Sequence, residues 1–170
     1  MTTPESLGRR LLRGAIGGFV AGLVFIGVTM WFVTITGGPA NQPLNLISSL
    51  GLGADALQNG GANPLLGFVI HSVLSIVFGM IFALFVPLFK TNGTVAAAGG
   101  LFGIALFVIN FLILAQTVVT QFKAPNLAFE LLAHAVFGHL LAFAFYSSGV
   151  RETEPVMAIG DNATPARTVT

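Results

Sequence analysis

The sequence contains no cysteine and very little charge. The absence of cysteine excludes disulfide bonds, thiolate metal sites and cysteine nucleophiles. Only 8% of the residues are charged and 55% are hydrophobic, whereas a soluble domain carries about 25% charged residues. A soluble protein of this composition would have too few polar groups to cover its surface, so the solvent around much of the chain must be lipid.

Several functional signatures are also missing. The net charge is +1 and no long basic run is present, so we expect no nucleic-acid partner. The chain has no Gly-x-Ser-x-Gly, no phosphate-binding loop, no His-Glu-x-x-His and no Cys-x-x-Cys-His. No residue pattern pairs a nucleophile with a base, and these absences together argue against an enzyme.

Four apolar stretches are each long enough to cross a bilayer, because about 20 residues at 1.5 Å each cover the hydrocarbon core. Asn63-Pro64 opens one stretch, Pro125-Asn126 opens another, and residues 90–93 form a tight turn. The fold class predicted is all-α, an integral membrane four-helix bundle of two helix hairpins. The predicted spans of this membrane domain (residues 14–148) are 14–36, 64–89, 94–117 and 126–148.

The basic residues predict the orientation, since Lys and Arg favour the cytoplasmic side of a membrane. Three arginines precede the first span, Lys90 joins the second and third, and Arg151 follows the fourth. The opposite loops hold only Lys123. We therefore expect a plasma-membrane protein of the bacterial inner-membrane type with both termini, including the N-terminal segment 1–13, in the cytoplasm.

Two connecting segments differ in character. The outer loop, residues 37–62, contains a stretch from Pro43 to Leu52 that is too short to span and too apolar for a free loop. We expect a short helix there, on the outer surface or packed over the bundle, with a poorly ordered connector as the alternative. The polar C-terminal tail, residues 152–170, is expected to be disordered.

The two halves of the membrane domain share a pattern. Gly18-x-x-x-Gly22 matches Gly99-x-x-x-Gly103 at a shift of 81, and His71 matches His134 at a shift of 63. This predicts a parallel internal repeat with an axis along the membrane normal. Glycines four apart lie on one helix face and permit close helix packing, within the chain or between copies of it.

Ionisable and amide groups inside the predicted spans are functional candidates, because burying them in lipid is costly. His71 and His134 each lie roughly 12 Å from the outer ends of their spans. Glu130 shares a helix face with His134, whereas His139 lies about 140° round the helix from His134. The candidate site residues are His71, Ser75, Asn110, Glu130, His134 and His139.

Three interpretations of this polar layer remain open. The side chains could simply bond neighbouring helices, or they could line a pathway for a small molecule or a proton. They could also hold a metal or haem, with His71 and His134 as axial ligands or with Glu130 joining both histidines around a metal ion.

A family resemblance rests on the same helices. His71-x-x-x-Ser75-Ile76-Val77-Phe78, Gly138-His139-Leu140 and a Gly/Ala-rich first span resemble the YagU-like small inner-membrane proteins. The resemblance implies the four-span architecture and points to His71 and His139. That family has no established biochemical activity and is associated with stress or transport at best.

These observations predict a non-enzymatic multi-pass protein of the plasma membrane, a small transport- or stress-associated component. We expect no cofactor, with haem b as the alternative in a redox subunit that uses His71 with His134 or His139. A structural or assembly subunit of a larger membrane complex is the other alternative. The expected partners are the lipid bilayer and either a second copy of the chain or a membrane partner subunit.

Overall fold

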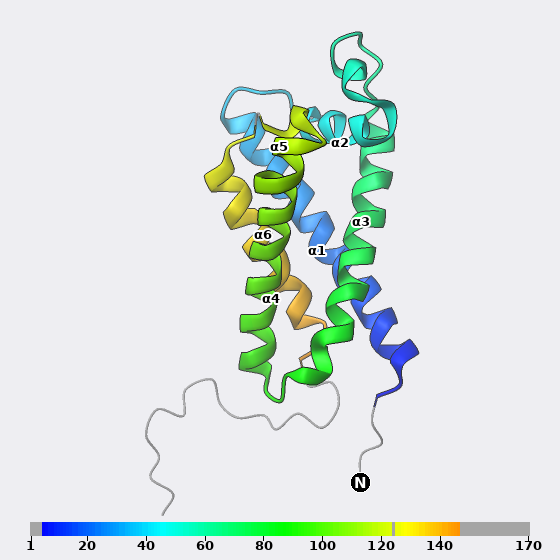
Figure 1. Cartoon of the computed structure of the whole chain (residues 1–170), viewed down its shortest axis with the longest axis vertical. Helices are drawn as coiled ribbons and strands as arrows, with labels where there is room; N and C mark the ends of the chain where they lie inside the picture. The colour runs from blue at the N-terminus through cyan, green and yellow to red at the C-terminus, as the bar shows by residue number, and fades with distance from the viewer. Residues whose placement is uncertain (1–4, 124, 147–170) are drawn as a thin grey trace, which may run out of the picture.

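The computed structural model describes residues 5–123 and 125–146, and these residues form helices and turns without any strand. The longer helices run side by side, and the short helix α2 lies across one end of them (Figure 1). The helices of more than ten residues are α1 (Leu7–Ile35), α2 (Gln42–Leu52), α3 (Pro64–Phe85), α4 (Asn92–Phe107) and α6 (Leu127–Phe143).

Short elements connect and extend these helices. They are η1 (Ala54–Leu57), η2 (Val86–Leu88), η3 (Val108–Leu114), α5 (Ala115–Thr117) and η4 (Thr120–Lys123). The segment η3 is a π-helix, and it joins α4 to α5 without a break, so that Asn92–Thr117 forms one apolar rod. The predicted tail 152–170 and the last residues of the predicted fourth span lie outside the described residues.

Local capping explains where the helices begin. The side chain of Asn63 accepts hydrogen bonds from the backbone amides of Leu65 and Leu66. The next residue, Pro64, has no N–H, so at the first position of the helix it leaves no donor unpaired. Asn126 caps α6 by accepting from the amide of Phe129 at 3.0 Å. Thr91 forms a capping box that opens α4.

The first helix is longer than the predicted span 14–36. It begins at Leu7, because Ser6 caps it by accepting from the amide of Arg9 at 3.4 Å. The basic residues therefore lie on the first turns of the helix rather than in a segment before it, and Arg13 pairs with Glu5 at 2.7 Å.

The exterior of the described chain is more apolar than that of a soluble protein. Large apolar residues face outward, as with Leu12 and Trp31, each 60% exposed. The buried positions include glycines and the polar residues Thr29, Glu130 and His134. Three helices are long and apolar enough to cross a membrane, and α6 is a shorter apolar helix of 17 residues. A lipid-facing exterior over a partly polar interior makes this a helical membrane protein.

Glycines set the helix crossings within two pairs of helices, α1 with α3 (the first hairpin) and α4 with α6 (the second hairpin). In the first hairpin, Gly18 of α1 lies against the Ser75 carbonyl of α3. In the second, Gly99 of α4 lies against the Gly138 carbonyl of α6, and Gly103 lies against the backbone of His134. A Cβ at these glycines would overlap backbone atoms, so the close approach requires a residue without a side chain.

The hairpins meet through α1 and α6, whereas α3 and α4 do not pack along their length although they are consecutive (Figure 1). Helix α2, within the predicted loop 37–62, packs on the start of α3, where Gly67 lies against the Leu44 carbonyl. Ser48 Oγ accepts from the Asn63 amide at 3.2 Å, and Gln121 Nε2 donates to Ser49 Oγ at 3.0 Å. These bonds hold α2 over the end of the bundle.

Candidate functional site

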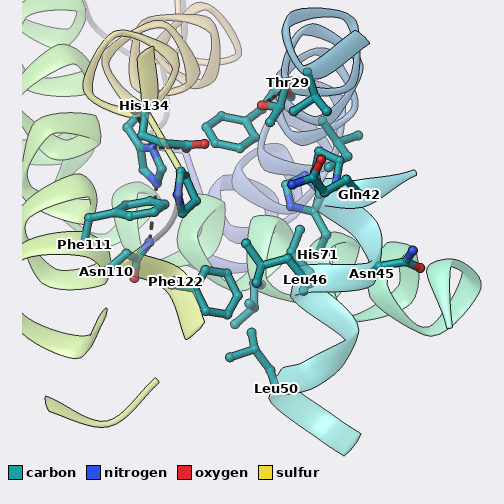
Figure 2. Close-up of a pocket in the computed structure, with 18 of the residues that line it drawn as sticks. Thr29, Gln42, Asn45, Leu46, Leu50, His71, Asn110, Phe111, Phe122 and His134 are labelled. Atoms are coloured by element: carbon teal, nitrogen blue, oxygen red, sulfur yellow. Dashed lines mark hydrogen bonds and ion pairs between the residues drawn. The ribbon is translucent and has the colours of Figure 1, made fainter. Parts of the chain in front are cut away.

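A cavity of about 730 Å³ lies between the two hairpins, on the side of α2 that faces the bundle. Its walls come from α1, α2, α3, η3, η4 and α6, so segments far apart in the sequence contribute to one space (Figure 2). Most of the lining is apolar. Five of the six predicted site residues line it, namely His71, Ser75, Asn110, Glu130 and His134.

His134 is held by two polar contacts. Its Nδ1 lies 2.8 Å from the backbone oxygen of Glu130, which can only accept, so Nδ1 carries the proton and donates. Its Nε2 is then an acceptor and lies 3.4 Å from Asn110 Nδ2, as the dashed line in Figure 2 marks. This pattern suits a neutral imidazole, because a doubly protonated ring could not accept from Asn110.

His71 is fixed from the other hairpin. Its Nε2 lies 2.9 Å from the carbonyl oxygen of Gly22, so this nitrogen donates and Nδ1 is the lone-pair acceptor of a neutral ring. Ser75 Oγ lies 3.4 Å from the same Nε2. The close approach of α1 to α3 at Gly22 therefore also determines the orientation of the imidazole.

Aromatic rings separate the two histidines. The ring of Phe25 stacks on His71 at a centroid distance of 5.7 Å and meets His134 edge-on at 4.9 Å. Phe111 lies edge-on to His134 at 5.6 Å. Seven phenylalanines line the cavity in all. Sequence reasoning missed this aromatic wall, because the spacing of the chain's 16 phenylalanines does not distinguish pocket-facing from lipid-facing positions.

Glu130 supplies the only carboxyl group among the described residues of the lining. It lies in the first turn of α6 and is 6% exposed. Its Oε2 is 3.8 Å from His134 Nδ1, which is too long for a hydrogen bond, and that nitrogen already donates to the backbone oxygen. The carboxyl group therefore has no hydrogen-bonding partner among the described side chains.

His139 does not line the cavity. Its Nδ1 donates to the Ala135 carbonyl at 2.8 Å, and its exposed ring lies over Gly100 of α4. The angle of about 140° expected between His134 and His139 matches this separation. Thr29, a buried polar residue of α1, also lines the cavity and donates to the Phe25 carbonyl at 2.9 Å.

Asn110 lies within the π-helix η3, a feature that the sequence did not predict. A π-turn adds a residue to the helical turn and changes the direction in which the following side chains point. Such turns occur often at functional sites. Both Asn110, which lies against His134, and Phe111, which forms part of the cavity wall, belong to this π-helix (Figure 2).

His71 and His134, the axial ligands in the haem alternative, are both in contact with other groups in this structure. Phe25 occupies the space between the two rings, and the Nε2 atoms of both histidines already have polar partners. Among the described residues lining the cavity, no lysine or arginine is available to pair with carboxylates such as haem propionates. No group of three His, Asp or Glu side chains comes together as metal ligands in the described part of the chain.

Comparison with known proteins places this helical membrane protein in a family. Residues 8–155 match a family of unknown function (DUF6789), and the chain belongs to it. The match gives no specific support for the resemblance to the YagU-like proteins. No curated protein and no solved structure matches the chain.

Proposed function

We propose that this protein crosses the membrane four times and binds a small, largely apolar molecule in the cavity between its hairpins, as a transport-associated component. One observation carries the proposal: the cavity of about 730 Å³ combines a mainly apolar wall with a few convergent polar groups. Ligand sites typically have volumes of about 300–1,000 Å³ and this composition.

The surroundings of the cavity support a ligand that arrives through the lipid. Since α3 and α4 do not pack along their length, the hairpins are joined mainly through α1 and α6, and the cavity is partly open. Apolar side chains such as Leu74 of α3 and Leu114 of η3 contribute to its lining. An apolar molecule could therefore enter sideways without crossing a polar barrier.

The architecture proposed with this function is two related hairpins with both termini in the cytoplasm. Gly18 opposes Ser75 in one hairpin and Gly99 opposes Gly138 in the other, and these pairs correspond at the shifts of 81 and 63 that align the halves. This equivalence supports a parallel internal repeat, with the ligand between its two units. A single bundle of this size would move its ligand as a homo-oligomer or beside a partner subunit.

Equilibrium binding of a neutral, apolar fluorescent probe to the protein in mild detergent tests the proposal. Leu46, on α2, lines the cavity (Figure 2), and Leu46→Trp should fill part of it and lower the affinity at least 10-fold. The matched control Leu101→Trp adds the same side chain at a position 67% exposed and should change the affinity less than 2-fold. Equal affinities of both variants and of the original protein would refute the cavity as the binding site.

A further inference from the structure

Resting on the proposed binding function, we propose that the cavity selects a lipophilic organic cation, with the carboxylate of Glu130 as its counter-charge and the phenylalanine rings as its walls. The formal charges around the cavity are asymmetric, because Glu130 is the only Asp, Glu, Lys or Arg side chain among the described residues of the lining.

The basic residues that the structure describes lie elsewhere. Lys123 belongs to η4 near the cavity, but it is exposed and does not contribute to the lining. Arg13 pairs with Glu5 at the first turns of α1, at the end of the bundle remote from α2 (Figure 1). Among the described residues of the lining, an anionic ligand such as a phosphate ester or a fatty acid would therefore meet a carboxyl group and no cation, which is unfavourable in a medium of low dielectric constant.

The neighbouring histidines leave the negative group uncompensated. His134 Nδ1 donates to the backbone oxygen of Glu130 rather than to its carboxylate, and its Nε2 accepts from Asn110. The hydrogen bonds of His71 likewise suit a neutral ring. A buried carboxylate without a partner is costly, and a cation that arrives with the ligand removes this cost.

The aromatic wall is suited to the same ligand. Phe25 and Phe111 each contact the ring of His134, which lies beside the carboxyl group of Glu130. The faces of aromatic rings attract cations, and the attraction is stronger where water is excluded. A lipophilic organic cation, whose charge is delocalised or surrounded by hydrocarbon groups, can pack against the apolar wall and pair with the carboxylate.

Two probes of the same shape and opposite charge test the inference. Binding of tetraphenylphosphonium and of tetraphenylborate is measured by equilibrium dialysis against the protein in detergent, with protein-free micelles subtracted. We expect saturable binding of the cation that is at least 10-fold tighter than that of the anion. Glu130→Gln should lower the affinity for the cation at least 10-fold, and Glu130→Asp, which keeps the charge, should restore part of it.

The neutral fluorescent probe separates the two proposals, and folding is controlled separately. Glu130→Gln should elute as a single folded peak in size-exclusion chromatography, and Leu101→Trp, at an exposed position outside the cavity, should bind all three probes as the original protein does. If the neutral probe binds but the cation and anion bind equally, or if Glu130→Gln leaves cation binding unchanged, the charge selectivity is refuted and the binding function survives. If none of the three probes binds saturably, both proposals are refuted.

Discussion

The contact between α1 and α3 provides a sharp test of the fold, because two glycines of the same helix have opposite surroundings. A Cβ on Gly18 would overlap the Ser75 carbonyl and lie 3.0 Å from the Cα of Gly79. A Cβ on Gly27 would have no atom within 4 Å. Gly18→Ala therefore forces two backbones apart, whereas Gly27→Ala adds a methyl group that meets no other part of the protein.

The magnitude follows from the cost of overpacking, which is about 1–3 kcal/mol for an inserted methyl group that cannot be accommodated. For a chain of this length, that corresponds to a fall in Tm of about 2–12 °C, at about 2–4 °C per kcal/mol. Gly27→Ala should stay within about 1 kcal/mol of the original protein, the scale of the helix-propensity difference between glycine and alanine.

The assay is the loss of the folded peak in size-exclusion chromatography after heating in mild detergent, for both variants in parallel. The overlap at Gly18 involves the backbone of Ser75, whose Oγ lies 3.4 Å from His71 Nε2 in the cavity wall. Gly18→Ala should therefore also weaken binding of the neutral probe. Equal midpoints for Gly18→Ala and Gly27→Ala would refute the reasoning that glycine is required at the crossing.

Two further predictions concern the membrane. The chain lacks cysteine, so single cysteines can be labelled with an impermeant maleimide: Asp55→Cys should react in intact cells, and Lys90→Cys and Thr170→Cys only after the cells are broken. Reaction of Thr170→Cys together with Asp55→Cys would show that α6, the shorter helix, does not cross. Trp31, the sole tryptophan, is 60% exposed on α1; its fluorescence should be strongly quenched by brominated lipid, and quenching equal to that by aqueous iodide would place it outside the bilayer.

Local chemistry accounts for the parts of the fold that sequence reasoning reached. Asn63, Thr91 and Asn126 cap helices because their side chains accept hydrogen bonds from backbone amides in the first turn. This signal depends only on the few residues at the start of each helix. The same-face placement of His71 with Ser75 follows from helical geometry alone. Such inferences need no knowledge of the rest of the structure.

The cavity could not be predicted from the sequence, for a physical reason. In a soluble helix the polar face marks the solvent, but here both the lipid-facing and the inward-facing positions are apolar, so periodicity does not identify the wall of a pocket. The π-helix around Asn110 and the packing of α2 on α3 depend on contacts between distant segments. The angle of about 140° indicates from the sequence that His139 and His134 face different directions, but it does not give the place of His139 over Gly100.

The most direct test of the central claim is to find where a bound apolar molecule lies. The intact protein in lipid nanodiscs is labelled with a neutral alkyl diazirine, and the modified residues are mapped by mass spectrometry. The account predicts saturable labelling around Leu46, Asn110 and Glu130 that excess unlabelled probe removes. Labelling spread over lipid-facing positions such as Leu101, without competition, would contradict it.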